Sequence, residues 1–378
     1  MDGMKDYLKW RGDISFLQVP VTPVDGLIFS AISYVDFRGF VPEEPTGFVP
    51  LGEVIERLLE EEDLSGKVRV KQDIALMKAA LETLRFMQCK IGFYREELRL
   101  EEEGQFAAVT FLLPDGSAFL TFRGTDKSVV GWKEDFNMGF CDEIPAQKYA
   151  LEYLQEYAAA SENILRIGGH SKGGNISVYA ASKVDEELQH RIYGIYNYDG
   201  PGFTEDFMAH DGYWRIVPRI HTYIPQSSII GMLLDHQESY SVIKSRNPGI
   251  LQHEIHSWEV QGGDFIHLQE ISAGNQFMNQ TIKKWLMDMS RQDRETFVDT
   301  LYEMIKSEKV TQVGDLLKPS NIGRFFKQLE SEESKRKIVF EEIAGFIRTA
   351  REVRKGLDEE EGNEEDGKQG ICDISCNS

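Results

Sequence analysis

The sequence predicts an α/β fold in which helices cover a mainly parallel β-sheet, with further helices at both ends. Two observations lead to this prediction. Between about residues 105 and 268, short apolar runs alternate with helix-like segments, an order typical of a mainly parallel sheet covered by helices. Between about residues 275 and 355, the pattern favours helices without strands. The 41% hydrophobic content is enough for a sizeable core in a chain of 378 residues.

The first hundred residues are mixed in character. An aromatic segment comes first, and helix-like stretches follow at 54–61 and 72–87. In the second stretch, apolar residues recur at helical spacing: Ile74, Met77, Leu81 and Leu84. We expect this part of the chain to pack against the sheet.

Six short apolar runs in the middle of the chain are predicted strands: 106–113, 118–122, 164–167, 192–198, 220–224 and 240–243. The turn Leu113-Pro114-Asp115-Gly116-Ser117 joins the first two as a hairpin. A helix is predicted over 145–160, because proline is well tolerated in a first helical turn. A second helix is predicted over 175–183.

The organisation predicted from these patterns has four parts. Residues 1–100 form a mixed segment that packs on the core, 101–270 form the α/β core, and 271–356 form a helical region. Residues 357–378 form an acidic tail with eight acidic side chains against one lysine. Such a run of like charges is typical of a disordered, solubilising segment.

Composition excludes several classes of function. A formal charge of −21 opposes nucleic-acid binding, which needs clustered lysine and arginine, and it opposes docking on anionic membranes. No run approaches the ~20 apolar residues of a membrane span, so we expect no stable membrane insertion. The first residues lack the apolar core of a signal peptide, which favours a cytoplasmic location. The four cysteines fit no strong metal spacing and are expected to be free thiols.

The hexapeptide Gly169-His170-Ser171-Lys172-Gly173-Gly174 is the most informative motif. It lies between a predicted strand and a predicted helix, which is the setting of the Gly-x-Ser-x-Gly nucleophile elbow. The turn is so tight that the serine takes a strained backbone, and its hydroxyl is raised above the sheet at the N-terminus of the following helix. Ser171 is therefore the predicted nucleophile.

A serine nucleophile also needs donors for the oxyanion of its tetrahedral intermediate. The predicted strand 118–122 runs into Arg123-Gly124-Thr125, so the backbone N–H of Thr125 can face the pocket above the sheet. The N–H of Lys172, directly after the nucleophile, would be its partner. The alternative is that Arg123 and Asp126 form an ordinary surface turn.

These motifs resemble the class 3 lipases of the α/β-hydrolase superfamily, and more closely an uncharacterised bacterial lipase-like branch. The resemblance covers about Lys9 to Leu268 and rests on Phe122-Arg123-Gly124-Thr125-Asp126 with Trp132 and Asp135, the Ser171 hexapeptide, Lys9-Trp10-Arg11-Gly12-Asp13, Ser33-Tyr34-Val35-Asp36-Phe37, and Gln252-His253-Glu254 with Trp258. It implies an α/β-hydrolase core and cleavage of esters, without a particular substrate.

The general base is expected to be His253. It follows the last predicted strand, where the catalytic histidine loop of this fold belongs, and it matches the Gln-His pattern of the resembled family. His256 and His236 are the alternatives. His170 adjoins the nucleophile, where elbow geometry would point it away from the reaction and leave it to shape the turn.

The acid that orients the base is less obvious. In class 3 lipases it follows the next-to-last strand, but here residues 225–229 contain no acid. Asp199, at the end of the strand after the nucleophile helix, resembles the pancreatic-type arrangement and is the preferred candidate. Asp235 is the alternative, and a Ser-His pair without a strong acid is a third possibility. The alternative, purely structural role of Asp199 would be to cap the Gly200-Pro201-Gly202 turn.

The sequence as a whole favours a serine hydrolase that cleaves carboxylic esters without a cofactor or a metal. Its substrate would be a small-molecule ester or lipid, such as a lysophospholipid, an acylglycerol or a smaller acyl ester. The segment 135–145, with Phe136, Met138 and Phe140, could form a short apolar flap, but simple core packing of these residues is preferred. The rival function is a catalytically weak or inactive scaffold that binds an acyl ligand or a protein partner, whose identity the sequence does not indicate.

Overall fold

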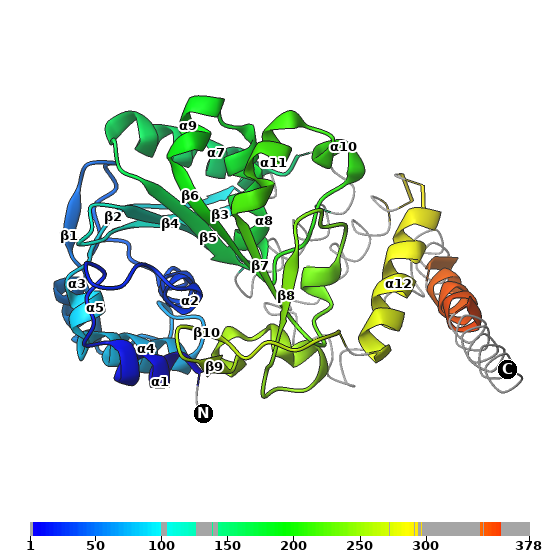
Figure 1. The fold of residues 1–378 in the computed structure, drawn as a ribbon, viewed down its shortest axis with the longest axis horizontal. Helices are drawn as coiled ribbons and strands as arrows, with labels where there is room; N and C mark the ends of the chain where they lie inside the picture. Colours follow the sequence, from blue (N-terminus) through cyan, green and yellow to red (C-terminus); the bar gives the residue numbers. More distant parts are fainter. Residues whose placement is uncertain are drawn as a thin grey trace, which may run out of the picture.

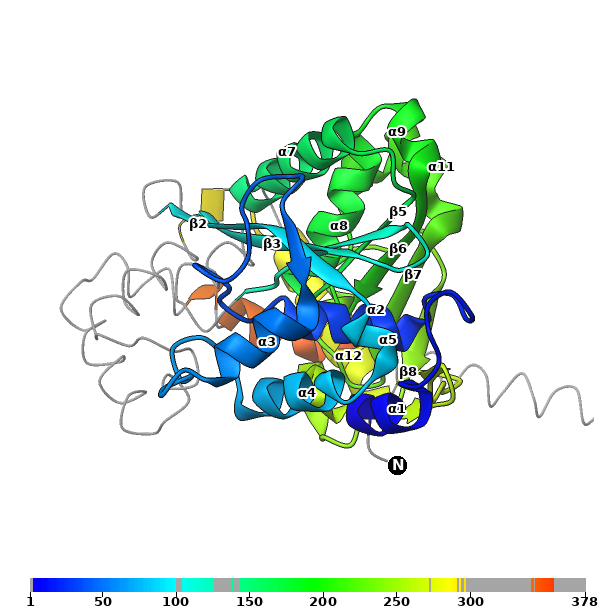
Figure 2. The same cartoon turned by 90° about the vertical axis from the view of Figure 1, so that its left-hand side faces the viewer.

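An eight-stranded sheet forms the centre of the molecule, with helices on both faces (Figures 1 and 2). This computed structural model describes residues 3–99, 104–125, 138, 143–271, 273–290, 292, 293, 296, 341, 342 and 344–356. The strands lie side by side in sequence order: β1 (Phe48–Pro50), β2 (Lys90–Arg99), β3 (Gly104–Leu112), β4 (Ala118–Phe122), β5 (Leu165–His170), β6 (Ile192–Tyr198), β7 (Ile220–Pro225) and β8 (Tyr240–Ile243). Strands β1 to β4 pair antiparallel, and β4 to β8 pair parallel.

The α/β class is therefore confirmed, but the sheet is more mixed than the sequence predicted. The difference comes from β1 and β2, which the sequence patterns did not indicate. In β2 the apolar run is interrupted by Arg95, Glu96 and Glu97. In the fold, Glu96 forms ion pairs with Arg123 and Arg38, so its charge is compensated within the sheet region.

Helices of the N-terminal hundred residues cover one face of the sheet (Figure 2). Their bounds are α1 (Gly3–Arg11), α2 (Pro23–Ile32), α3 (Leu51–Leu59), α4 (Lys71–Leu81) and α5 (Leu84–Met87). Every residue of α2 after its first proline is buried, so this helix has no polar face and no amphipathic period to reveal it. The predicted helix at 72–87 is split, because the Thr83 hydroxyl accepts the Phe86 N–H at 3.3 Å and starts a new helix.

The opposite face carries the helices of the alternating region, and a second apolar core fills the space beneath them. Their bounds are α7 (Pro145–Ala160), α8 (Lys172–Lys183), α9 (Glu186–Arg191), α10 (Glu205–Met208) and α11 (Asp211–Ile216). The predicted helix 145–160 and the predicted strands 192–198 and 240–243 are confirmed with the same bounds. The hairpin of β3 and β4 is confirmed as well.

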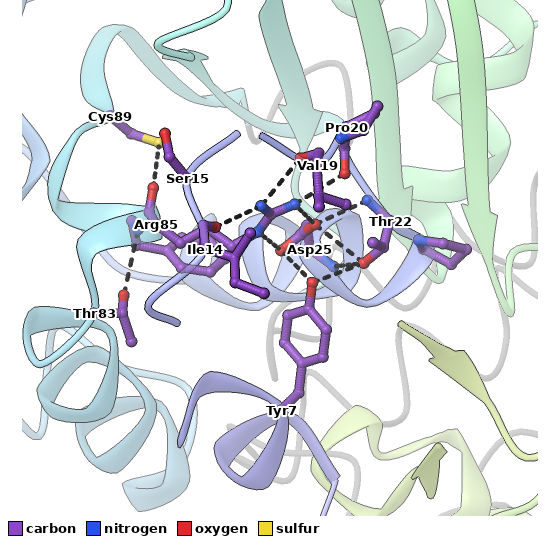
Figure 3. Close-up of polar contacts among 12 residues, drawn as sticks. Tyr7, Ile14, Ser15, Val19, Pro20, Thr22, Asp25, Thr83, Arg85 and Cys89 are labelled. Carbon is purple, nitrogen blue, oxygen red and sulfur yellow. Dashed lines mark hydrogen bonds and ion pairs between the residues drawn. The ribbon is translucent and has the colours of Figure 1, made fainter. Parts of the chain in front are cut away.

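A buried ion pair joins the N-terminal helices to one another (Figure 3). Arg85 and Asp25 are both fully buried, and two guanidinium nitrogens bind the two carboxylate oxygens at 2.8 and 2.6 Å. Tyr7 donates to the same carboxylate at 2.8 Å. The remaining guanidinium hydrogens bind backbone oxygens of Ile14, Val19 and Pro20. A buried pair is stabilising only when its other polar atoms are also satisfied, as they are here.

The C-terminal part of the described chain is helical. Helix α12 (Ala273–Asp288) packs beside a helix at 344–356, where the Trp285 indole lies edge-on to Phe346 and donates to the Glu342 carbonyl at 3.1 Å. In the part of the chain that the structure describes, no helix combines the length and the apolar character needed to cross a membrane. The acidic tail, Phe136 and Phe140 lie outside the described residues, whereas Met138 is buried in the core beneath α7.

Candidate active site

Ser171 stands at the sharp turn between β5 and α8. Its backbone has φ 60° and ψ −131°, a region that non-glycine residues rarely adopt. Gly169 and Gly173 allow this turn, because a methyl group on either would lie 2.3 or 2.1 Å from the Phe122 carbonyl oxygen. The Gly-x-Ser-x-Gly spacing therefore has a steric origin in this fold, namely the close approach of β5 and α8 to the end of β4.

The end of β4 lies beside this turn. A methyl group on Gly124 would meet the His170 carbonyl oxygen at 2.5 Å and the Ser171 Cβ at 3.2 Å. Thr125 follows directly, and Lys172 is the first residue of α8. The Lys172 ammonium binds the Gln105 carbonyl of β3 at 2.9 Å, so only its backbone is relevant to the turn. The two predicted oxyanion donors thus belong to chain segments that flank Ser171.

Arg123 is held inside the structure rather than on an exposed turn. Its guanidinium binds Glu96 of β2 at 2.5 Å and is 6% exposed. The other oxygen of the Glu96 carboxylate accepts from Tyr94 at 2.8 Å and pairs with Arg38 at 3.3 Å. These contacts fix the chain just before Gly124. Asp126, its companion in the predicted surface turn, lies outside the described residues.

His253 and Asp199 are in direct contact, although 54 positions separate them in the chain. The His253 Nδ1 lies 2.7 Å from the Asp199 Oδ2. Asp199 directly follows β6 with φ 55° and is fully buried, whereas the His253 side chain is 26% exposed. A neutral or protonated imidazole can donate from Nδ1 to this carboxylate, which leaves Nε2 to exchange a proton with a nucleophile.

His170, directly before Ser171, positions the backbone of His253. The His170 Nε2 lies 2.9 Å from the His253 carbonyl oxygen, and the two rings are 4.4 Å apart. Burial, and then the nearby His253 and Arg69, hold the pKa of His170 well below its usual range. His170 is therefore neutral. Because a carbonyl only accepts, the single ring proton is on Nε2, and Nδ1 accepts from the Tyr34 hydroxyl at 2.8 Å.

The loop that carries His253 is tied to the rest of the molecule on both sides of the histidine. Arg69 stacks 4.6 Å from the Tyr34 ring and binds both carboxylate oxygens of Glu254 at 2.7 Å. Before the histidine, the side-chain oxygen of Gln252 accepts the Ser227 N–H at 2.9 Å. The backbone carbonyl of Gln252 accepts from the buried Trp258 indole at 2.9 Å. Gln252, Glu254 and Trp258 therefore hold the loop in place around the partly exposed imidazole of His253.

The alternative bases and the alternative acid have other partners. The His256 Nε2 lies 2.7 Å from Asp73 on α4. The two nitrogens of His236 contact Glu238 at 3.0 Å and the Gly231 carbonyl at 2.7 Å. Asp235 pairs with Lys283 of α12.

Two contacts at Asp199 were not indicated by sequence. The Ser228 hydroxyl donates to the Asp199 Oδ2 at 2.7 Å. The other oxygen, Oδ1, is buried and has no hydrogen-bond partner among the residues described. A methyl group on Gly231 would lie 2.2 Å from Oδ1, so this glycine closes the space around the carboxylate. Neither residue belongs to a motif, and only the position of Ser228 shortly after β7 hinted at this site.

Groups of three or more His, Cys, Asp or Glu side chains that could hold a metal ion do not occur among the described residues. The acidic groups near His253 are instead bound to histidine, arginine or hydroxyl partners. The arrangement can supply a hydroxyl, an imidazole and an oriented carboxylate, which are the groups of nucleophilic acyl transfer.

A family model described as Mbeg1-like matches residues 80–303, more than half of the chain. The matched range contains the turn at Ser171, Asp199 and His253.

Two solved lipase structures show weak similarity to the chain. The crystal structure of M37 lipase is 15% identical, with a TM-score of 0.36, over 55% of this chain and 68% of the other. The Rhizomucor miehei lipase propeptide complex is 14% identical, with a TM-score of 0.32, over 50% of this chain and 72% of the other. Similarity at this level does not transfer a fold or a site. No curated protein matches the sequence.

Proposed function

The chain belongs to the Mbeg1-like family, and we propose that it is a serine hydrolase that cleaves carboxylic esters. Its core would be an α/β-hydrolase fold, with Ser171 as nucleophile, His253 as general base and Asp199 as the orienting acid. The observation that carries the proposal is the 2.7 Å contact between His253 and Asp199, together with a serine at φ 60° whose chain neighbour His170 contacts the His253 carbonyl. A strained serine at a strand–helix turn next to an oriented imidazole is the arrangement that nucleophilic acyl transfer requires.

The reaction would proceed in two halves. The Ser171 hydroxyl attacks the ester carbonyl carbon while His253 accepts the hydroxyl proton, and the carbonyl oxygen becomes an oxyanion. The backbone amides of Thr125 and Lys172 would stabilise this oxyanion by a few kcal/mol. When the intermediate collapses, His253 returns the proton to the departing alcohol and an acyl-serine remains.

Water completes the cycle. His253 takes a proton from water, the hydroxide formed attacks the acyl carbon, and the serine oxygen leaves with that proton as the carboxylic acid is released. Asp199 holds the Nδ1–H of His253 throughout and stabilises the cation that forms twice per turnover. No step requires a cofactor or a metal. The substrate class is a carboxylic ester such as a lysophospholipid, an acylglycerol or a smaller acyl ester.

Covalent labelling of the purified full-length protein with a fluorophosphonate probe tests the proposal. Wild-type protein should be labelled at Ser171, Ser171→Ala should not be labelled, and His253→Ala should be labelled at least ~10³-fold more slowly. Hydrolysis of p-nitrophenyl esters of increasing acyl length would then define the substrate.

Absence of labelling and of ester hydrolysis in folded wild-type protein would overturn the enzyme proposal. That outcome would favour the alternative of a non-catalytic scaffold that binds an acyl ligand or a protein partner. No contact in the described residues favours this alternative. Its support is the lack of an acid at residues 225–229, but Asp199, directly after the neighbouring strand β6, contacts His253 in its place.

A further inference from the structure

The ends of two neighbouring strands meet at the Asp199 carboxylate. Strands β6 and β7 are parallel, with Tyr198 opposite Tyr223, so the residues after their carboxyl ends lie at the same edge of the sheet. Asp199 follows β6 directly, and Ser228 lies three positions after the end of β7. Both residues are fully buried. This arrangement brings a second side chain to the group that binds His253.

We infer that Ser228 is a positioning residue for Asp199, and that position 228 is a second place from which a carboxylate can serve His253. The inference rests on the proposed function, because it concerns the same imidazole. Ser228, which belongs to no sequence motif, thereby joins the residues of the proposed site. The carboxylate that binds His253 could then stand either at position 199, after β6, or at position 228, after β7.

The first part follows from the contacts of a single oxygen. The Asp199 Oδ2 accepts from the Ser228 hydroxyl and from the His253 Nδ1, each at 2.7 Å. Hydrogen bonds to an ionised acceptor are stronger and more directional than those between neutral groups. Because Oδ1 has no hydrogen-bond partner in the described part of the chain, these two contacts determine how the carboxylate is turned. Removing the hydroxyl would leave His253, among the described residues, as the one side chain that holds the carboxylate.

The hydroxyl of Ser228 is itself oriented. Its oxygen accepts the Gly231 N–H at 3.3 Å, so its own proton is left to point at Asp199. A chain of donors therefore runs from the Gly231 backbone through Ser228 to the carboxylate, and such chains polarise their members in the same direction. A serine that only filled space would not need both contacts.

The second part follows from where the three side chains converge. The Ser228 Oγ and the His253 Nδ1 both lie within hydrogen-bond distance of one point, the Asp199 Oδ2. An aspartate at 228 would extend its carboxylate one bond further toward that point. If residue 199 is shortened to serine, the point becomes vacant. The new carboxylate can then reach Nδ1, and the residue 199 hydroxyl can donate to it, which reverses the two roles.

The first experiment compares Ser228→Ala with wild type in hydrolysis of p-nitrophenyl butyrate and in fluorophosphonate labelling. We expect kcat and the labelling rate to fall about 10-fold to 100-fold, with KM within about twofold, because a charge-assisted hydrogen bond is lost but no substrate contact is removed. Ser182→Ala is the matched control. Its serine is equally buried and donates to the Tyr179 carbonyl in α8, so its removal should leave both rates unchanged.

The second experiment moves the acid. Asp199→Ser should lower kcat by about 10³-fold or more. Adding Ser228→Asp to that variant should restore at least a tenfold gain in kcat, whereas a merely structural role for position 228 predicts no gain. Circular dichroism and thermal melting establish that each variant is folded.

Each outcome decides the matter. Full activity in Ser228→Ala, or no gain in the folded double variant, would overturn the inference while leaving the proposed function in place. If the double variant does not fold, the result for Ser228→Ala decides. Failure of wild-type protein to hydrolyse esters or to react with the probe would instead overturn the proposed function, and the inference with it.

Discussion

Ser171 and Asp199 share an unusual backbone. Each is a non-glycine residue with positive φ, 60° and 55°, and each stands directly after one of two neighbouring parallel strands. Such conformations cost about 1–3 kcal/mol each and persist where the surrounding structure determines them. Here Ser171 donates its N–H to the Tyr198 carbonyl at 2.9 Å, and Asp199 donates to the Tyr223 carbonyl at 2.9 Å. Among the described residues, four non-glycine residues have positive φ, and two of them, Ser171 and Asp199, are the candidate site residues.

The strained backbone at Ser171 predicts that two substitutions with the same effect on labelling differ in their effect on stability. Ser171→Gly and Ser171→Ala should both abolish labelling by a fluorophosphonate, but the glycine variant should be more stable by about 1 kcal/mol. Relief of strain worth about 1–3 kcal/mol exceeds the added unfolded-chain entropy of glycine, about 0.5–1 kcal/mol. Urea unfolding of the two variants measures the difference. A glycine variant less stable than the alanine variant by about 0.5–1 kcal/mol, the entropy cost of glycine alone, would show that the turn is not strained.

Gly231 closes the space around the Asp199 carboxylate, so a methyl group there should disturb the acid without touching His253. In Gly231→Ala the new methyl would lie 2.2 Å from the Asp199 Oδ1, and either the carboxylate or the turn must shift. A displacement of about 1 Å in a catalytic group costs about 100-fold in rate. We expect kcat for p-nitrophenyl ester hydrolysis to fall by about that factor.

Gly274→Ala is the matched control for this substitution, because nothing lies within 4 Å of its added methyl. Its activity should equal that of wild type. A Gly231→Ala enzyme within twofold of wild type would contradict the assignment of Asp199 as the acid.

At the scale of elements, the segment between β7 and β8 is held by Glu238. This buried carboxylate accepts from Tyr213 of α11 and Thr222 of β7, each at 2.7 Å, and contacts His236 at 3.0 Å. Burial alone would raise the pKa of Glu238, but hydrogen bonds from His236, Tyr213 and Thr222 outweigh it and lower the pKa to about 2. Through His236, which contacts the Gly231 carbonyl, this cluster supports the turn beside Asp199.

A lowered pKa makes the stability depend on pH in a definite direction. The carboxyl of Glu238 titrates near 4.5 when unfolded and near 2 when folded, so its contribution is complete above about pH 5 and is lost as pH falls toward 2. Glu238→Gln should therefore lower the free energy of unfolding by roughly 3 kcal/mol at pH 7, and the difference from wild type should shrink as the pH is lowered.

Urea unfolding at pH 7 and at pH 3 checks this expectation. Glu56→Gln, an exposed substitution on α3, should change stability little at either pH. A difference for Glu238→Gln that is the same at both pH values would contradict the assigned titration.

At the scale of the whole molecule, a buried ion pair joins the helices before β2 to one another. Asp25 belongs to α2, Arg85 to α5, and Tyr7 of α1 donates to the same carboxylate (Figure 3). The same segment supplies Tyr34 and Arg69, which bind His170 and Glu254 near the candidate base. Loss of this attachment would therefore weaken both the fold and the support of the site.

Arg85→Met should destabilise the protein by about 3–5 kcal/mol, because it leaves the carboxylate of Asp25 buried without its counter-charge. Arg99→Met, which removes a half-exposed pair with Glu97, should cost less than about 1 kcal/mol. Chemical unfolding of both variants tests the contrast. Equal small losses would mean that the buried pair does not hold the N-terminal helices.

Local patterns predicted much of this fold. The strands β6 and β8 and the helix α7 have their predicted bounds, because each combines an apolar pattern with a clear boundary signal. Strand β2 and helix α2 were missed for opposite reasons. The first carries charges at Arg95 and Glu96 whose ion-pair partners are distant in the chain, and the second is buried on all sides and so lacks an amphipathic period. Neither feature can be recognised from neighbours in the sequence.

Local patterns in the chain were enough to predict the α/β class, the order of most strands and the turn at Ser171, because these depend on side chains close together in the chain. They also indicated His253 as the base and Asp199 as its preferred acid, with His236, His256 and Asp235 as alternatives. The three-dimensional arrangement was needed to show that His253 and Asp199 lie 2.7 Å apart, that Ser228 and Gly231 enclose the carboxylate, and that residues of the N-terminal segment contact the loop of His253. Contacts of this kind join residues tens of positions apart, and the pairing of parallel strands, not local propensity, brings them together.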